Sequence, residues 1–279
     1  MSLTSTAELI ERAIARGGAV PAFNVIMLEH AEAIAAGASS AGAILQISEN
    51  AVRFHGGDPA PLLLACRAVA RAASVPLALH LDHVQDPRLV DLAIRSSRRW
   101  GLGSIMVDAS RLPYAENVAA TTAAAARAHR AGILVEAELG EIGGKDGAHA
   151  PGVRTDPQEA AAFADATNVD LLAVAVGSSH AMRERSAAVD TALVERIAQR
   201  VHVPLVLHGS SGVPDSDLRQ AIGAGMRKVN VGTALNLAAT STLRTALAAD
   251  PDIVDPRRYT VPVRDAMTHV VARFSAVIA

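Results

Sequence analysis

Leu79-His80-Leu81-Asp82-His83 closes one of the short apolar runs that recur along the whole chain and decide its fold. Two further runs end in the same way, Val176-Gly177-Ser178-Ser179-His180 and Val206-Leu207-His208-Gly209. If these runs are parallel strands of one barrel, their terminal histidines meet at one mouth of it. Three neutral imidazoles with an open fourth position suit a catalytic Zn²⁺. The carboxylate of Asp82, beside a candidate ligand, is placed for acid/base work.

The apolar runs alternate with longer, alanine-rich amphipathic segments from one end of the chain to the other. We expect strands at 19–24, 43–48, 76–82, 103–108, 132–138, 171–177, 203–208 and 226–231. Such alternation over this length predicts a (β/α)₈ TIM barrel in the α/β class. Additional helices are expected at Thr6–Arg16 and Arg264–Val277. A doubly wound open sheet is the alternative fold. No linker rich in Pro, Gly or Ser divides the chain, so residues 1–279 are expected to form a single domain.

The composition narrows the class of protein. The chain of 279 residues is 50% hydrophobic and 19% charged, which is enough apolar material for a large core. Its net charge of −2 disfavours a partner such as nucleic acid or a membrane surface. A single cysteine, Cys66, excludes an internal disulfide framework and fits a reducing compartment. Without a secretory signal pattern or a long apolar run, the expected location is cytoplasmic.

A polar residue stands at the carboxyl end of every expected strand, where barrel enzymes place their catalytic groups. The series is Asn24, Ser48, Asp82 with His83, Asp108, Glu138, His180, His208 and Asn230. Each has an ordinary alternative: a single histidine is usually structural, and Asp82 or Asp108 could cap the following helix. Glu136 and Glu138 share one face of their strand by the period of two. The joint pattern, not any one residue, favours a metal site.

Two short segments have the composition of phosphate-binding loops. His208-Gly209-Ser210-Ser211-Gly212 is a small-residue loop after the seventh strand, and Val229-Asn230-Val231-Gly232-Thr233 opens a helix after the eighth. Backbone N–H groups at this end of a barrel commonly hold phosphate, although ordinary tight turns look alike in sequence. Arg183 and Arg185 would either add charge-assisted contacts or be solvated loop residues. A glycine-rich loop at 140–147 could carry Glu141 or Asp146 over the mouth as a lid.

Taken together, these motifs resemble the class II, metal-dependent ketose-bisphosphate aldolases, both fructose- and tagatose-bisphosphate aldolases. The resemblance spans nearly the whole chain. It is carried by Pro21-Ala-Phe-Asn24, Leu79-His-Leu-Asp-His83, Met106-Val-Asp108-Ala-Ser110, Val135-Glu-Ala-Glu-Leu-Gly140 with Gly143-Gly144, Leu205-Val-Leu-His-Gly209, Lys228-Val-Asn230 and Asp255-Pro-Arg257. The resemblance implies an aldehyde-lyase of carbohydrate metabolism, as in glycolysis. It would reversibly cleave fructose- or tagatose-1,6-bisphosphate into dihydroxyacetone phosphate and glyceraldehyde 3-phosphate.

The resemblance also implies a role for each matching position. His83, His180 and His208 would hold the catalytic zinc, and Glu138 and Asp108 match positions that bind a second or displaced metal. Asp82 would move the proton of the C4 hydroxyl, and Asp146 would be the lid carboxylate. The expected substrate- and phosphate-binding residues are Asn24, Ser48, Gly209, Ser211, Asn230, Thr233, Ala181 and Arg185. A monovalent cation (Na⁺ or K⁺) beside the phosphate and a homodimer or homotetramer are further family properties.

The chain departs from the family pattern at three places. Val84 follows the Asp-His pair where a small residue or His is usual, Ala181 replaces a Gly, and Asp146 is one methylene shorter than Glu. These changes favour, as an alternative substrate, another phosphorylated ketose such as a deoxy-keto-gluconate phosphate. A sugar-phosphate-binding relative without catalysis is a further alternative. Of the two lysines, Lys228 could point into the barrel, which leaves a Schiff-base mechanism as a minor alternative.

Overall fold

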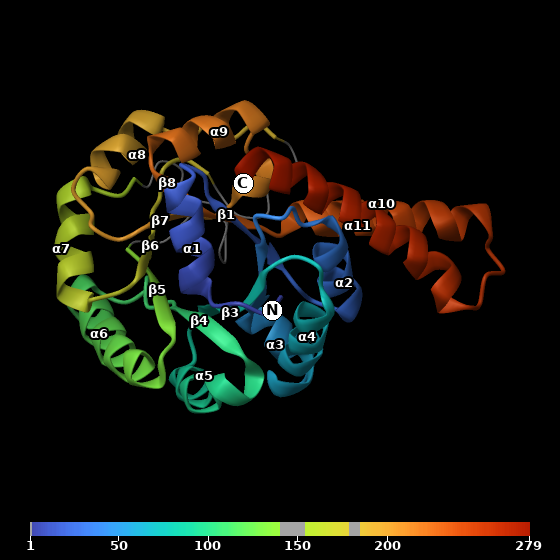
Figure 1. Cartoon of the computed structure of the whole chain (residues 1–279), viewed down its shortest axis with the longest axis horizontal. Coiled ribbons are helices and arrows are strands. Elements are labelled where there is room, and N and C mark those ends of the chain that lie inside the picture. The colour runs from blue at the N-terminus through green and yellow to red at the C-terminus, as the bar shows by residue number, and fades with distance from the viewer. Residues whose placement is uncertain (1, 140–153, 179–184) are drawn as a thin grey trace.

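Eight parallel strands close into a barrel in chain order in the computed structural model, which describes residues 2–139, 154–178 and 185–279 (Figure 1). The strands are β1 Val20–Asn24, β2 Ala43–Ser48, β3 Leu77–Val84, β4 Leu102–Val107, β5 Leu134–Glu138, β6 Leu171–Ala173, β7 Leu205–Leu207 and β8 Met226–Val231. β1 pairs with both β2 and β8, so the barrel is closed. The predicted TIM barrel is confirmed, and the doubly wound alternative is wrong.

Helices cover the outside of this barrel and its amino end (Figure 1). They are α1 Thr6–Ala15, α2 Leu28–Gly37, α3 Glu49–Phe54, α4 Ala60–Ala72, α5 Pro87–Trp100, α6 Tyr114–Ala131, α7 Pro157–Thr167, α8 Thr191–Ala198, the 3₁₀ turn η1 Ser210–Gly212, α9 Asp215–Ala224, α10 Thr233–Ala249 and α11 Pro256–Ile278. Cys66 is buried in α4. Over the described ranges, no helix combines the length and the apolarity that crossing a bilayer requires.

Side-chain alternation along the strands produces two separate cores. Residues such as Leu79 and Leu81 point outward and pack with the surrounding helices in the main core. The intervening residues point into the barrel, where Ile44, Ala78 and Val206 belong to a second cluster. Helix α1 lies across the amino end of the barrel and adds Leu9, Ile10 and Ala13 to that cluster (Figure 1). The apolar floor of the barrel is thereby sealed from water.

Strands β6 and β7 are shorter than the apolar runs from which they were predicted. The run 171–177 stays buried over its first six residues, yet only Leu171–Ala173 pair as a strand. Beyond that point the backbone bonds to loops: Thr155 and Ala175 bond to each other, and the Asp190 N–H donates to the Val176 carbonyl. The apolar run therefore predicts correctly that this segment is buried. Where its pairing with neighbouring strands ends depends on hydrogen bonds to the loops.

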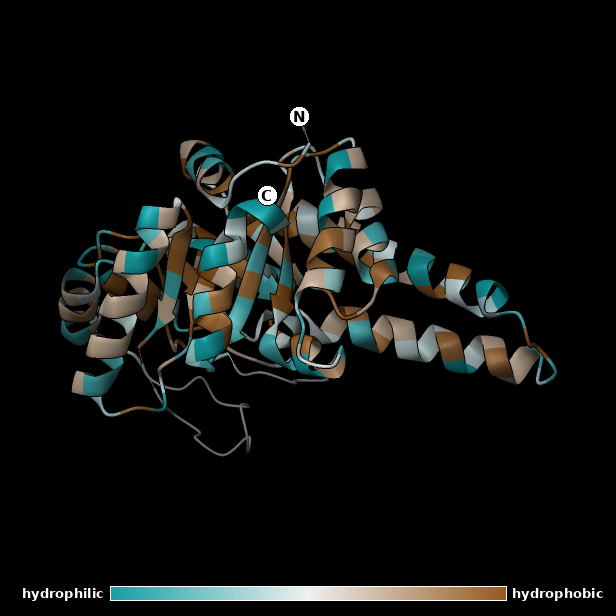
Figure 2. Ribbon diagram, turned by 90° about the horizontal axis from the view of Figure 1, so that it is seen from below, coloured by the Kyte–Doolittle hydropathy of each residue, from teal (hydrophilic) through white to brown (hydrophobic). Residues whose placement is uncertain are grey.

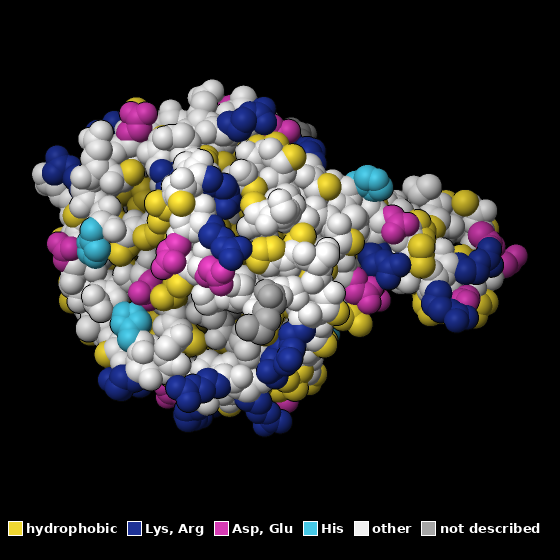
Figure 3. Space-filling model, viewed as in Figure 1, with side chains coloured by type: hydrophobic (Ala, Val, Ile, Leu, Met, Phe, Trp, Pro, Cys, Tyr) yellow, Lys and Arg dark blue, Asp and Glu magenta, His cyan; other side chains and the backbone are white. Residues whose placement is uncertain are grey.

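The last two helices form an arm that projects from the barrel (Figures 1 and 2). The final helix was predicted to begin at Arg264, but it begins at Pro256, where Asp255 caps it by accepting from the Arg257 N–H. Proline inside a helix usually interrupts it, so Pro262 obscures the helical pattern before Arg264. Figure 3 shows hydrophobic side chains and both signs of charge on the arm.

Candidate metal centre and substrate site

The carboxyl end of β3 departs from regular strand geometry at His83. Alternation places Ala78, His80 and Asp82 toward the barrel interior, so the next residue would normally face the outer helices. His83 instead has φ +49°, and the pairing of β3 with β4 shifts register between Leu81 and Val84. A left-handed histidine is uncommon and costs conformational energy. This bulge brings Asp82 and His83 to the mouth together.

Two overlapping groups of side chains at the mouth could hold a metal ion. Asp82, His83 and His208 each offer one ligand atom, and these atoms lie within 4.8 Å of one another. His83 also forms such a group with Asp108 and Glu138. The rings of His83 and His208 meet edge to face with centroids 4.8 Å apart. Imidazole nitrogens and carboxylate oxygens are the donor set that zinc accepts, so the residues present fit a divalent metal.

His208 is completely buried and lies between two carboxylates of β5. Its Nε2 is 2.9 Å from Oε1 of Glu136, and its Nδ1 is 3.5 Å from Oε2 of Glu138. Burial alone would lower the pKa of the imidazole, but these two glutamates raise it to about 9. The surroundings of the ring therefore favour a positive charge there, whether a proton or a bound cation carries it.

A second layer of polar groups lies below the mouth, inside the barrel. The Lys228 ammonium donates to Oε2 of Glu136 and to Oδ1 of Asn230, both at 2.8 Å. Although burial opposes ionisation of Glu136, Lys228 and the hydrogen bond from His208 hold its pKa far below the ordinary value. His80 is neutral, because burial and then the charge of Lys228 lower its pKa to about 3. Its Nδ1 lies 2.8 Å from the Ser104 hydroxyl.

Asp82 stands between these two layers. Burial would raise its pKa, but His83 and then Lys228 hold the pKa below the ordinary value, so the carboxyl is ionised. The Asn24 side-chain amide donates to Oδ2 of Asp82 at 3.4 Å, and the Gln46 amide in turn donates to Asn24 at 2.9 Å. Oδ1 of Asp82 is buried and accepts no hydrogen bond within the described residues. A carboxylate held on one oxygen and open on the other is suited to take and return a proton.

The loops after β7 and β8 lie side by side at the mouth. Gly209 adopts φ +67°, a left-handed conformation that turns the chain into the 3₁₀ turn. The Ser211 hydroxyl accepts from the N–H of Ala234, in the first turn of α10, at 3.1 Å. Asn24, at the end of β1, lies against Gly232 so closely that a Cβ on this glycine would be only 2.7 Å from Oδ1 of Asn24. The end of β1 therefore adjoins the same two loops. Thr233 begins α10, so its helix N-terminus faces this cradle.

The remaining predicted residues have other described contacts. Ser48 caps α3 by accepting from the Ala51 N–H at 3.2 Å. Arg185 donates to the Val213 carbonyl and to Asp215 of α9, and its guanidinium lies over the Phe274 ring. Its role in phosphate binding stays a prediction, since the structure engages it with α9 and α11. Asp146, His180 and Ala181, and with them the lid and the third histidine ligand, lie outside the described residues.

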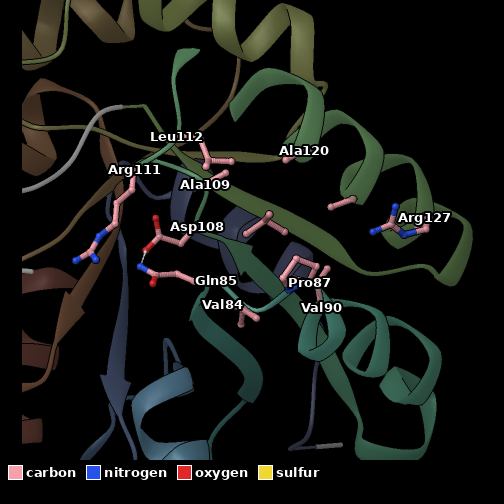
Figure 4. Close-up of a pocket in the computed structure, with 12 residues that line it drawn as sticks. Val84, Gln85, Pro87, Val90, Asp108, Ala109, Arg111, Leu112, Ala120 and Arg127 are labelled. Carbon is pink, nitrogen blue, oxygen red and sulfur yellow. Dashed lines mark hydrogen bonds between the residues drawn. The ribbon is translucent and has the colours of Figure 1, made fainter. Parts of the chain in front are cut away.

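A largely apolar cavity of about 350 Å³ adjoins the metal site between β3–α5 and β4–α6 (Figure 4). Its lining residues are Val84, Gln85, Pro87, Val90, Val107, Asp108, Ala109, Arg111, Leu112, Ala120, Ala124 and Arg127. Asp108 faces both places, because its Oδ2 contacts His83 Nδ1 at 3.2 Å and accepts from the Gln85 amide at 3.3 Å. Val84 thus lines a cavity that opens beside the mouth.

Sequence reasoning assigned no role to Gln46 or His80, and it considered Lys228 only as a minor Schiff-base alternative. All three occupy inward positions two residues before a predicted site residue, namely Ser48, Asp82 and Asn230. The period of two was therefore the available signal. Their partners come from other strands, so the sequence could indicate their direction but not their contacts.

Comparison with known proteins gives a consistent result. Residues 4–279 match the family model of class II fructose-bisphosphate aldolase. The YdjI aldolase from Escherichia coli K12 is 28% identical, with a TM-score of 0.81 and coverage of 99% of this chain and 97% of that one. A protein of Coccidioides immitis, provisionally assigned as a fructose-1,6-bisphosphate aldolase, is 32% identical, with a TM-score of 0.86 and coverage of 98% and 95%.

A third solved structure resembles the chain in fold. Fructose-bisphosphate aldolase from Campylobacter jejuni is 21% identical, with a TM-score of 0.75 and coverage of 99% of this chain and 94% of that one. The family match covers nearly every residue, and the fold is a closed barrel of eight parallel strands. The chain belongs to the class II fructose-bisphosphate aldolase family and is an aldolase, a carbon–carbon lyase.

Proposed function

We propose that this aldolase reversibly cleaves a ketose 1,6-bisphosphate, fructose- or tagatose-1,6-bisphosphate, into dihydroxyacetone phosphate and glyceraldehyde 3-phosphate, and that it requires zinc. The observation that carries the proposal is the approach of Asp82, His83 and His208 ligand atoms to within 4.8 Å at the barrel mouth. His83 and His208, with His180, would hold the ion, and Asp108 and Glu138 offer it a second position. When bound, zinc would supply Lewis-acid polarisation of the substrate carbonyl.

In this proposal the chain's own residues orient the substrate and move two protons. Asp82, whose Oδ1 is open, takes the proton of the C4 hydroxyl as the C3–C4 bond breaks and returns it in condensation. Asn24 holds the other oxygen of Asp82 and so fixes the direction of the open one. Asp146 would exchange the C3 proton of dihydroxyacetone phosphate.

The phosphate group would lie where the loops after β7 and β8 meet. Gly209, Ser211, Asn230 and Thr233 provide backbone N–H groups, hydroxyls and an amide there, at the N-terminus of α10. Ser48, Ala181 and Arg185 complete the proposed substrate-binding set. A monovalent cation (Na⁺ or K⁺) beside the phosphate is part of the same proposal.

The second candidate substrate is another phosphorylated ketose, for example a deoxy-keto-gluconate phosphate. Val84 favours it, because this residue lines the cavity beside the mouth where the family usually has a small residue or histidine. The two candidates differ in the aldehyde half and share Asp82 and the metal ligands. The same residues therefore serve either substrate.

A coupled assay with fructose-, tagatose- and deoxy-keto-gluconate phosphates, with and without a chelator, tests the proposal. We expect chelator-sensitive release of a triose phosphate from a ketose bisphosphate, with activity restored by zinc. Release that persists after metal analysis shows an empty protein would contradict the zinc requirement. Activity confined to the gluconate derivative would favour the second candidate, and binding of every ketose without turnover would favour a binding protein.

We also propose a cytoplasmic homodimer or homotetramer in which residues 1–279 act as one domain. The arm supports self-association, because it leaves Leu237, Leu247, Val254 and Val261 exposed beside side chains of both charges (Figure 3). Light scattering coupled to size exclusion measures the mass. A monomer at micromolar concentration would contradict the assembly.

A further inference from the structure

The Glu136–Lys228 ion pair lies inside the barrel and has no part in the proposed chemistry. Both side chains are completely buried, as is His208 above them. A buried ion pair is expensive to desolvate and is seldom kept for stability alone. The pair acts directly on His208, which Glu136 contacts. The inference below rests on the proposed function, because it concerns a ligand of the proposed metal ion.

Glu136 holds the His208 ring through one nitrogen only. Its Oε1 lies 2.9 Å from Nε2 of His208, and its Oε2 lies 2.8 Å from the Lys228 ammonium. An ionised carboxylate can only accept hydrogen bonds, so Nε2 must carry the hydrogen. In a neutral imidazole the other nitrogen then presents a lone pair. That nitrogen, Nδ1, faces Glu138 and the mouth.

Lys228 keeps Glu136 in this acceptor state. The ammonium donates to Glu136 and Asn230 at 2.8 Å and to Oε1 of Gln46 at 3.5 Å, so three acceptors match its three hydrogens. This arrangement also speaks against Lys228 as a Schiff-base nucleophile, which would need a free lone pair on its nitrogen. The lysine instead places a fixed positive charge behind the carboxylate.

We propose that Glu136 and Lys228 are positioning residues that fix the His208 tautomer with Nε2 protonated, so that Nδ1 is the nitrogen offered to the metal. Glu136 would thus hold the His208 ring from the side of Nε2, while Nδ1, on the side of Glu138, would be left to hold the metal. Partners of this kind raise the basicity of a ligand and set its orientation. His83 has its own carboxylate neighbour, Asp108, 3.2 Å from Nδ1.

The test compares metal affinity and tautomer in matched variants of the full-length protein. Glu136→Gln keeps the shape of the side chain, but its amide can donate as well as accept, so the ring is free to reverse its tautomer. We expect a 10- to 100-fold loss of zinc affinity, measured by competition with a chromophoric chelator. The visible spectrum of the Co²⁺-loaded protein should change as well.

The control is Asp170→Asn, directly before β6 and beside the amino end of β5. Like Glu136, Asp170 is a carboxylate that contacts a histidine: it lies 2.8 Å from Nε2 of His129 and also accepts from the Val135 N–H. We expect this variant to keep the zinc affinity of the unmodified protein. The double variant Glu136→Gln/Lys228→Met removes both charges of the ion pair together and so leaves neither unpaired. It provides the test if Glu136→Gln alone fails to fold. It should lose zinc affinity as Glu136→Gln does.

Nitrogen-15 NMR of labelled histidines reads the tautomer directly. In the zinc-loaded protein, the His208 signals, assigned by their loss in His208→Gln, should show hydrogen on Nε2 and metal on Nδ1. Unchanged affinity in Glu136→Gln, or metal on Nε2, would overturn this inference while leaving the metal site in place. Failure of the unmodified protein to bind any divalent metal would instead overturn the proposed function.

Discussion

The lower and upper halves of the barrel interior come from the same strands but contain opposite kinds of side chain. The lower half is an apolar floor of Val20, Ile44, Ala78, Leu171 and Val206, closed by α1. The upper half is a polar layer of Gln46, His80, Glu136, Lys228 and His208, with Asp82 and Glu138 above it. A step of two residues, about 6.6 Å along a strand, separates one environment from the other.

This difference separates stability from chemistry within one fold. Burying the apolar floor stabilises the barrel by about 25 cal/mol for each Å² of apolar surface removed from water. The polar layer contributes little of this kind, because each of its charges must first be desolvated. Substitutions in the floor should therefore change the free energy of unfolding and leave catalysis intact. Substitutions in the polar layer should act chiefly on metal binding and catalysis.

The largest expected effect is on catalysis in the upper half. Asp82→Asn removes the carboxylate that takes the C4 proton, so we expect kcat to fall by about 10²- to 10⁴-fold. Metal content and the thermal midpoint should change little, because Asn keeps the shape and the contact with Asn24. Steady-state kinetics with metal analysis measures both. A variant with full activity would remove Asp82 from the proton transfer.

The second prediction concerns stability in the floor. Leu171→Ala leaves a cavity in the closed end of the barrel, and such truncations cost about 2–5 kcal/mol. Denaturant unfolding measures the loss, and kcat per folded molecule should stay within about twofold. If kcat fell as far as in Asp82→Asn, the two halves would not be separable.

The third prediction uses the neutral His80. Its pKa in the folded protein is lowered to about 3, so between that value and about 6.5 the unfolded chain binds one more proton than the folded one. Stability therefore falls as pH drops through this window, by about 1.4 kcal/mol per pH unit from this residue. His80→Gln should remove that part of the slope, which unfolding curves at pH 6, 5 and 4 measure. An unchanged slope would mean that His80 is already neutral in the unfolded chain or charged in the folded one.

The sequence was sufficient to predict those features of the two halves that depend on neighbouring residues of one strand. Alternating apolar runs predicted the barrel, and the position of Asp82, Glu138 and Asn230 at the ends of runs predicted one polar mouth. Glu136 could be placed on the same face as Glu138 by the period of two. These inferences need only the directions of neighbouring side chains on a strand.

Contacts between distant strands could not be derived in the same way. Lys228 meets Glu136 because β8 and β5, three strands apart in the closed barrel, both direct side chains into its interior, although 92 residues separate the two along the chain. The left-handed backbone conformation of His83 could not be predicted, because the residue is not a glycine. Packing and site geometry impose this conformation against the local preference of the residue. The length of α11 was hidden by Pro262. In each case tertiary structure overrides the local pattern.

The smallest expected effect lies at the boundary between the two halves. The Thr6 hydroxyl of α1 lies 2.8 Å from that of Ser104, which in turn contacts His80, so a chain of polar contacts reaches from the floor to the polar layer. Thr6→Val keeps the shape of the side chain and removes one hydrogen bond, which costs about 1 kcal/mol. Ser104 keeps its bond to His80, so zinc affinity and kcat should not change.

Because α1 closes the floor, a loss of zinc affinity in this variant would show that the floor and the mouth are coupled through His80 rather than independent. Unfolding curves and chelator competition on the same preparation distinguish these outcomes, with Ser104→Ala, which breaks the chain one step closer to the site, as the more severe comparison.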